Sequence, residues 1–218
     1  IFINNLAAPA NTKVFSLTHR LHLTQPQAYI FDPELPYWII YRNQLFDSVC
    51  RKLDFDVFEV FRDRQLTNKL LSSSGELRVL KSRNLSDDGK EILDIPGYDS
   101  YISYAAAKPL SVFQYLDAPN VYLTPNMTYK PRMMKKPPHC VVNGSLAILI
   151  PKGGIVPTEK QLAYFSSEEY RAFYQIARNF QTRSLNVDAC SVFFYGLLRD
   201  EAKPAPEKFD TSVQLSFL

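Results

Sequence analysis

The sequence is poor in the residues that build disulfide scaffolds, zinc sites and flexible linkers. Its three cysteines, Cys50, Cys140 and Cys190, lie far apart, are odd in number and form no CxxC pair. A disulfide framework or a structural zinc site is therefore not expected, and we predict reduced, mostly buried thiols in a cytoplasmic protein. Only 7 glycines stand against 15 prolines, which indicates stiff connections rather than flexible linkers.

Long apolar runs are also missing. No stretch approaches the roughly 18 consecutive apolar residues of a transmembrane helix, so no contact with a membrane is expected. The chain opens Ile-Phe-Ile-Asn-Asn, without the basic and apolar regions of a signal peptide, which favours the cytoplasm. The absence of an initiator methionine fits a segment of a longer protein.

Catalytic signatures are lacking as well. His19 and His22 are spaced for one helical face, but no glutamate completes a motif such as HExxH. No GxSxG, GxxxxGK[ST] or GxGxxG sequence occurs. The acidic pairs Asp87-Asp88 and Glu168-Glu169 fit a turn and the first turn of a helix, where acids favour the helix dipole. We therefore assign no catalytic residue and no metal ligand.

What is present indicates one mixed domain. At 218 residues, 46% of them hydrophobic, the chain can bury a sizeable core. Apolar and β-branched patterns predict strands at residues 37–41, 77–81, 121–123 and 145–150. Helical spacing predicts helices at 44–53 and from about 168 to 179, the second with a capping box of Ser166 and Glu169.

The fold class predicted from these elements is α+β, with a largely antiparallel sheet and a few short helices. Residues 1–198 would form the domain, and residues 190–198 are apolar enough to be buried. Residues 199–218 read as a polar linker followed by a final alternating strand at 213–217. The sequence pattern does not decide the secondary structure of residues 101–116.

Charge is unevenly distributed along the chain, although its net value is only +3. Residues 118–158 contain no Asp or Glu, yet they include Lys130, Arg132, Lys135, Lys136 and Lys152. Such a stretch is a candidate footprint for a polyanion. A basic surface loop without a partner is the equally simple alternative.

Polar clusters with the side chains of DNA readers follow several apolar elements. Arginine forms two parallel hydrogen bonds with guanine, Asn and Gln do the same with adenine, and Lys, Ser and Thr contact phosphates. The candidates for contact with bases are Arg62, Arg64, Gln65, Arg83, Asn84, Arg183 and Asn186. The candidates for contact with phosphates are Lys69, Lys81, Lys130, Arg132, Lys135 and Lys136. These residues fall in or near four polar clusters, at 62–69, 81–84, 126–132 and 178–186. Helix capping and ordinary surface polarity explain any one cluster as well, and the four together favour nucleic acid.

Four strings in these regions resemble a known family. They are RDRQLTNKLL, LRVLKSRNLSDDG, VYLTPNMTYKPR and EYRAFYQIARNFQTRSLNVDACSVFFYG. They look like the C-terminal part of adenine-specific DNA methyltransferases of type II restriction–modification systems, above all those paired with type IIS endonucleases that read asymmetric sites. The resemblance covers roughly residues 35–198.

This resemblance implies a target-recognition domain that follows a catalytic domain binding S-adenosylmethionine and that grips double-stranded DNA while an adenine is flipped out. It implies work in the bacterial cytoplasm, protecting host DNA from a partner endonuclease. The family's [N/D]PP[Y/F] tetrapeptide and its glycine-containing cofactor motif are both absent, and Asp32-Pro33-Glu34-Leu35 is no substitute. DNA reading is therefore carried over, while catalysis and the cofactor belong to a catalytic domain of the same polypeptide outside this chain.

Two other functions remain open. One is a restriction endonuclease fragment or a small hydrolase, which would need a metal-binding acidic cluster. The other is a protein-interaction module, such as a specificity subunit that docks a separate methylase. Its interface would be the aromatic face of the helix from Tyr170 to Tyr174.

Overall fold

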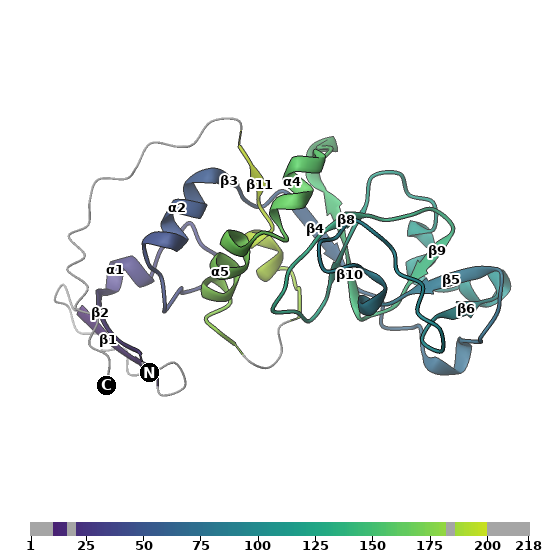
Figure 1. The fold of residues 1–218 in the computed structure, drawn as a ribbon. Coiled ribbons are helices and arrows are strands. Elements are labelled where there is room, and N and C mark those ends of the chain that lie inside the picture. The colour runs from purple at the N-terminus through teal and green to yellow at the C-terminus, as the bar shows by residue number, and fades with distance from the viewer. Residues whose placement is uncertain (1–10, 17–20, 182–185, 200–218) are drawn as a thin grey trace.

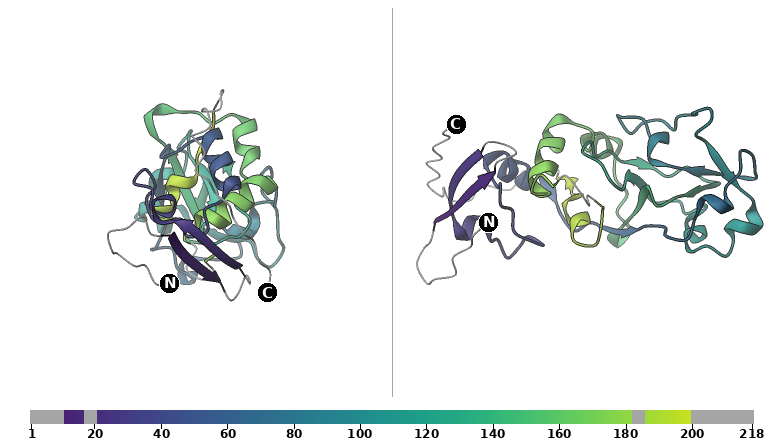
Figure 2. Two further views of the ribbon diagram at one scale, coloured as in Figure 1. Left: turned by 90° about the vertical axis from the view of Figure 1, so that its left-hand side faces the viewer. Right: turned by 90° about the horizontal axis from the view of Figure 1, so that it is seen from below.

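The computed structural model describes residues 11–16, 21–181 and 186–199. These residues form an elongated molecule, with an N-terminal hairpin at one end and a small sheet at the other (Figures 1 and 2). Between the two ends lie a layer of helices and a central sheet. Within the described residues no helix has the length and apolar character needed to cross a membrane.

The central sheet has four antiparallel strands in the order β4-β10-β7-β8. They are β4 (Phe58–Phe61), β10 (Leu146–Pro151), β7 (Tyr122–Pro125) and β8 (Met134–Lys135). Successive side chains of β10 point to opposite faces of the sheet. As a result Ala147 and Leu149 enter one hydrophobic core, while Leu146 and Ile148 enter another.

The first core lies under two helices, α2 (Gln44–Lys52) and α5 (Glu168–Ala177). It is rich in aromatic rings: Phe46 stacks on Phe173 with ring centroids 5.1 Å apart. Tyr170 donates its hydroxyl to the Phe194 carbonyl at 3.0 Å, inside the short helix η5 (Ser191–Phe194). A two-stranded pair, β3 (Leu53–Asp54) with β11 (Leu197–Leu198), closes this core.

The second core lies between the central sheet and a three-stranded sheet in the order β6-β5-β9. Its strands are β6 (Ser100–Ile102), β5 (Leu77–Leu80) and β9 (Cys140–Val142). The β5–β9 pair is the only parallel pair among the described strands. Helices α3 (Tyr104–Ala107) and η3 (Ser111–Tyr115) cover this side, which resolves the open state of residues 101–116.

The N-terminal hairpin pairs β1 (Asn11–Ser16) with β2 (Leu21–Pro26) and leads into α1 (Gln27–Ile30). It has a small core of its own around Val14, Leu23 and Ile30. The remaining short elements are η1 (Asn68–Leu70), η2 (Ser82–Asn84), η4 (Lys152–Gly154) and α4 (Glu159–Tyr164).

The predicted fold class is confirmed: the domain is α+β with mostly antiparallel pairing. The predicted helix at 44–53 and the strands at 77–81, 121–123 and 145–150 are present, with ends shifted by one or two residues. The prediction of a strand at 37–41 is wrong: no described strand pairs with these residues, and their backbone bonds instead to the Ile30 carbonyl and to the side chain of Asn179. Asn179 accepts from the Ile40 amide at 2.7 Å and donates to the Trp38 carbonyl at 2.8 Å.

Two smaller expectations are also corrected, and a third is not tested. The cap of α5 is Ser167, whose hydroxyl accepts from the Tyr170 amide, and not Ser166. Cys190 is exposed because it precedes η5 at the surface, and Cys50 and Cys140 are only partly buried. The final strand at 213–217 and the linker beyond Arg199 lie outside the described residues.

Candidate nucleic-acid interface

Polar segments from several strands meet at one end of the central sheet. Strands β4 and β7 end there and β10 begins there, since Phe61 lies opposite Ile148 and Pro125 lies opposite Leu146. The turns that follow β4 and β7 therefore leave the sheet on the same side as the turn that precedes β10.

The turn after β5 joins the same place through the parallel β5–β9 pair. Both strands run toward this end, and the Asn143 amide donates to the Leu80 carbonyl at 3.1 Å. The Ser82 amide then donates to the Ser145 hydroxyl at 2.9 Å. Three of the four polar clusters found in the sequence are thus brought together, although they lie far apart along the chain. We call this region the polar end; it comprises residues 62–66, 81–85, 126–132 and 143–145, with Asn186.

Asn126 holds the polar end together. Its side-chain amide donates to the Gly144 carbonyl and to Asn186 Oδ1, each at 3.0 Å. Its Oδ1 accepts from Arg62 at 3.3 Å and from the Val187 amide at 3.1 Å. One buried side chain therefore joins four segments, and its hydrogen-bonding groups are all occupied by protein.

The cluster after β4 presents its long side chains to solvent. Arg64, Gln65 and Lys69 are exposed, and Arg62 is half-buried against Asn126. Asp63 is buried, where its carboxylate accepts from the Leu66 amide at 2.8 Å and fixes the turn. Gln65 Oε1 accepts from the Ser111 amide at 2.7 Å, which orients its exposed amide group.

The cluster after β5 is built around the ring of Tyr98. The Lys81 ammonium lies 3.8 Å and the Arg83 guanidinium 4.6 Å from its centroid. Lys81 also donates to the Tyr98 carbonyl and, at 3.0 Å, to the Ser100 hydroxyl. Partial burial, together with the charge of Arg83, lowers the pKa of Lys81. Arg83 remains exposed, so the two cations that contact Tyr98 give this turn a positive charge, which a phosphate would balance.

Three predicted contact residues are corrected because they lie in the interior. Asn84 is fully buried, accepting from the Lys81 amide at 2.9 Å and donating to Asp99 at 2.7 Å. Arg132 is buried and donates to the Ser82 and Leu85 carbonyls, both at 3.2 Å. Lys136 is buried and donates to the Leu116 carbonyl at 2.7 Å, and burial lowers its pKa. In this conformation these three side chains support the fold and do not reach a ligand.

The other predicted residues are spread more widely. Lys130 is exposed and lies 3.6 Å from the Asp87 carboxylate, a separation at which a phosphate would compete for it. Lys135 is exposed on β8 opposite Tyr122, about 10 Å along β7 from the polar end at the usual rise per strand residue. Asn186 is half-buried and bonded to Asn126, and Arg183 lies outside the described residues.

Tyr98 and Ser145, on which the arrangement also depends, were not predicted as site residues, and Asn126 was recognised only as the first residue of the polar cluster at 126–132. Asn126 follows the predicted strand at 121–123 and Ser145 begins the predicted strand at 145–150, positions that do not indicate a central junction. Tyr98 follows Pro96-Gly97, which reads only as a turn.

The aromatic interface proposed for the helix from Tyr170 to Tyr174 does not exist as a surface. Tyr170, Phe173 and Tyr174 are almost completely buried. Burial raises the pKa of both tyrosines well above the ordinary value. The apolar face of α5 is committed to the first core, so a protein partner cannot dock on it.

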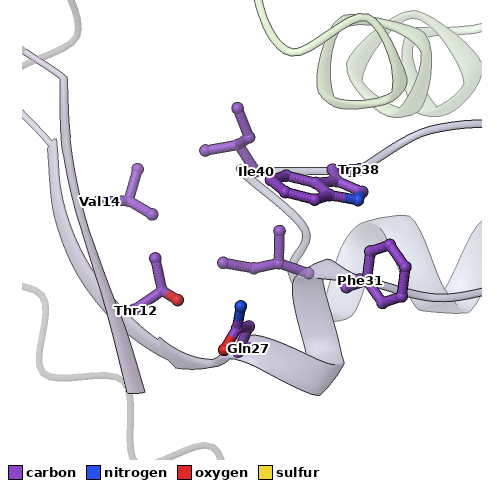
Figure 3. A pocket seen from close by; sticks show the side chains of 7 residues that line it. Thr12, Val14, Gln27, Phe31, Trp38 and Ile40 are labelled. Carbon is purple, nitrogen blue, oxygen red and sulfur yellow. The ribbon is translucent and has the colours of Figure 1, made fainter. Parts of the chain in front are cut away.

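A separate apolar pocket lies at the N-terminal hairpin (Figure 3). Val14, Ile40 and Trp38 line it, with Thr12 and Gln27 as its polar side chains. Phe31 and Trp38 meet edge to face at 5.6 Å and are both well exposed. A nucleoside cofactor such as S-adenosylmethionine is commonly held by a carboxylate on its ribose hydroxyls, and the described residues that line the pocket supply none. The pocket does not fit that cofactor.

Comparison with known proteins gives no assignment: no protein-family model matches the chain, and no curated protein matches it.

Proposed function

We propose that this domain recognises a specific sequence in double-stranded DNA on behalf of an adenine-N6 DNA methyltransferase of a restriction–modification system. Its catalytic domain, with S-adenosylmethionine, would lie elsewhere in the same polypeptide, in the cytoplasm of a bacterium. The observation that carries the proposal is the gathering of Arg62, Arg64, Gln65, Arg83 and Lys130 at the polar end.

The chemistry of this region suits a duplex. Guanidinium and amide groups are the side chains that read base edges in the major groove, and lysines anchor phosphates around them. Loops held on a rigid sheet are also the usual carriers of binding residues. The Asn126 junction provides that support, because it fixes the turns relative to one another before any ligand binds.

The resemblance to methyltransferases gives the proposal its particular form. The four strings include the segments after β4, β5 and β7, and these are the segments that meet at the polar end. No step of methyl transfer is assigned to any residue here, since the sequence lacks the tetrapeptide that would hold a flipped adenine.

The test is fluorescence anisotropy of a labelled duplex of mixed sequence, titrated with the purified protein at two salt concentrations. Binding that weakens steeply with salt supports DNA recognition, because phosphate contacts release counterions. No binding at low salt would contradict the proposal.

One observation favours a second function, a protein-docking module. The exposed Phe31 and Trp38 beside the pocket form an apolar patch of the kind that marks interaction sites. This function would be favoured over DNA recognition by two results together. The protein would co-purify with a methylase subunit, and Trp38→Ala would abolish that co-purification; the protein alone would show no affinity for DNA.

A further inference from the structure

The loop after β7 presents two large apolar side chains in the middle of the polar end. Met127 is 63% exposed and Tyr129 is 51% exposed. Exposing this much apolar surface is unfavourable relative to burial. Neither side chain belongs to either of the two main cores, so core packing does not account for their position.

The loop is nevertheless held in a defined shape. Asn126 anchors its start, with its backbone amide donating to the Ser145 carbonyl at 2.9 Å. The Thr128 hydroxyl accepts from the Lys130 amide and donates to the Lys130 carbonyl, each at 2.9 Å. Arg132 then fixes the end of the loop to the turn after β5. Presenting the two side chains therefore costs little additional ordering on binding.

The charges around the loop define its partner. Arg62 contacts the anchor of the loop, Lys130 follows it directly, and Arg83 lies on the turn to which Arg132 ties it. An apolar protein surface would be a poor match for these cations, whereas a duplex offers phosphates outside and apolar base faces inside. Proteins that deform DNA use this combination, placing Met or aromatic side chains against base steps between phosphate contacts.

We propose that Met127 and Tyr129 enter the duplex and pack against unstacked bases, while the surrounding cations hold the phosphates. This inference rests on the proposed function and adds a distinct mode of contact to it: recognition through the deformability of a base step, besides hydrogen bonding to base edges. Tyr129 contributes its ring face rather than its hydroxyl.

The experiment uses the protein as described above and a labelled duplex of mixed sequence, with the double variant M127A/Y129A and the single variant Tyr129→Phe. The double variant should bind about tenfold more weakly, the effect expected for losing one stacking contact. Its salt dependence should keep the same slope, because no phosphate contact is removed. Tyr129→Phe, which retains the ring, should bind like the unmodified protein.

Matched controls come from the far end of the molecule and of the sheet. Phe31 is 52% exposed at the N-terminal hairpin, and Val156 is 69% exposed beyond the opposite end of β10. Phe31→Ala and Val156→Ala should leave affinity unchanged. Permanganate reactivity of thymines in the same duplex reports unstacking directly, and it should rise with the unmodified protein and not with M127A/Y129A.

The outcomes separate the two proposals. If the unmodified protein fails to bind the duplex at low salt, the proposed function fails and the insertion fails with it. If it binds and the double variant matches the controls, or if thymine reactivity does not rise, DNA recognition stands and the insertion is overturned. Thermal melting of each variant identifies any loss of binding that comes from unfolding.

Discussion

Asn126 donates a hydrogen bond from its side-chain amide to Asn186 Oδ1 at 3.0 Å, across 60 residues of sequence. The contact ties the segment that precedes η5 to the turn after β7. Because the same side chain also reaches Arg62 and Gly144, a single amide joins four segments of the polar end.

Replacing Asn126 by alanine should lower the free energy of unfolding by roughly 1–3 kcal/mol, since it leaves buried partners such as the Val187 amide and the Gly144 carbonyl unsatisfied. Urea denaturation measures the change. Met127→Ala, which alters the next residue but no buried hydrogen bond, is the control and should stay within about 0.5 kcal/mol of the unmodified protein. Equal stability of the two variants would show that the junction is not needed.

Two adjacent lysines should give opposite results. Lys135→Ala removes an exposed charge on β8, so we expect weaker binding to every DNA sequence, a salt slope reduced by about one, and unchanged stability. Lys136→Ala removes the buried donor to the Leu116 carbonyl, so stability should fall by roughly 1–3 kcal/mol. Its salt slope should stay the same in conditions where the variant remains folded.

Titration of each variant with duplex at several salt concentrations measures the salt slope, and titration with denaturant measures stability. Lys160, exposed on α4 away from the polar end, supplies the control for charge alone: Lys160→Ala should change neither quantity. A reduced salt slope for the Lys136 variant would contradict the position of that side chain in the interior.

Arg83→Ala and Arg64→Ala should each cost about 1–3 kcal/mol of binding to the preferred sequence and relax the choice of base at one position. Both side chains are exposed at the polar end, and Arg83 is oriented by the ring of Tyr98. Competition between duplexes that differ at single positions measures the effect. A uniform loss over all sequences would reassign these arginines to phosphates.

The pH dependence of stability should show the contribution of the ionised Asp99 carboxylate. Burial alone would raise the pKa of this carboxylate, but hydrogen bonds from the Ile95 amide and Asn84, with the charge of Arg78, outweigh burial and lower it. A lowered pKa in the folded state contributes stability that is fully present above the unfolded value of about 3.9 and is lost as the pH falls through the folded value. The stability difference between the unmodified protein and Asp99→Asn should therefore be largest near neutral pH and shrink below about pH 4.

Denaturation at neutral and acidic pH provides the comparison. Asp94, which faces the same arginine from an exposed position, gives the control, because Asp94→Asn should show a much smaller effect at every pH. A difference for Asp99→Asn that does not vary with pH would mean that the carboxylate is not held ionised by its partners.

Elements with a regular apolar period could be predicted from the sequence, because their pattern reflects which face is buried. The helical spacing of Leu45, Val49 and Leu53 is of this kind, and the continuous apolar run of β10 likewise reflects burial on both faces of the sheet. Residues 37–41 have the composition of a strand but lack a partner strand, and their backbone bonds to Asn179, which is distant in sequence. The local composition of residues 37–41 does not predict such a long-range contact.

The candidate site was predictable in part for a similar reason. The sequence shows where Arg, Lys and amide residues follow apolar elements, and the structure brings three of those clusters together. It does not show which members face inward: Lys135 and Lys136 are chemically identical neighbours, and only the path of β8 exposes one and buries the other. Burial of Asn84 likewise follows from its contact with Asp99 and not from its own type.

The most direct test of sequence recognition is selection from a pool of random duplexes by the purified domain, followed by sequencing of the bound fraction. We expect enrichment of one short, asymmetric sequence, and a relaxed choice of base at one of its positions with Arg83→Ala. A bound fraction with the same base composition as the starting pool at every position would contradict the claim that this domain reads DNA sequence.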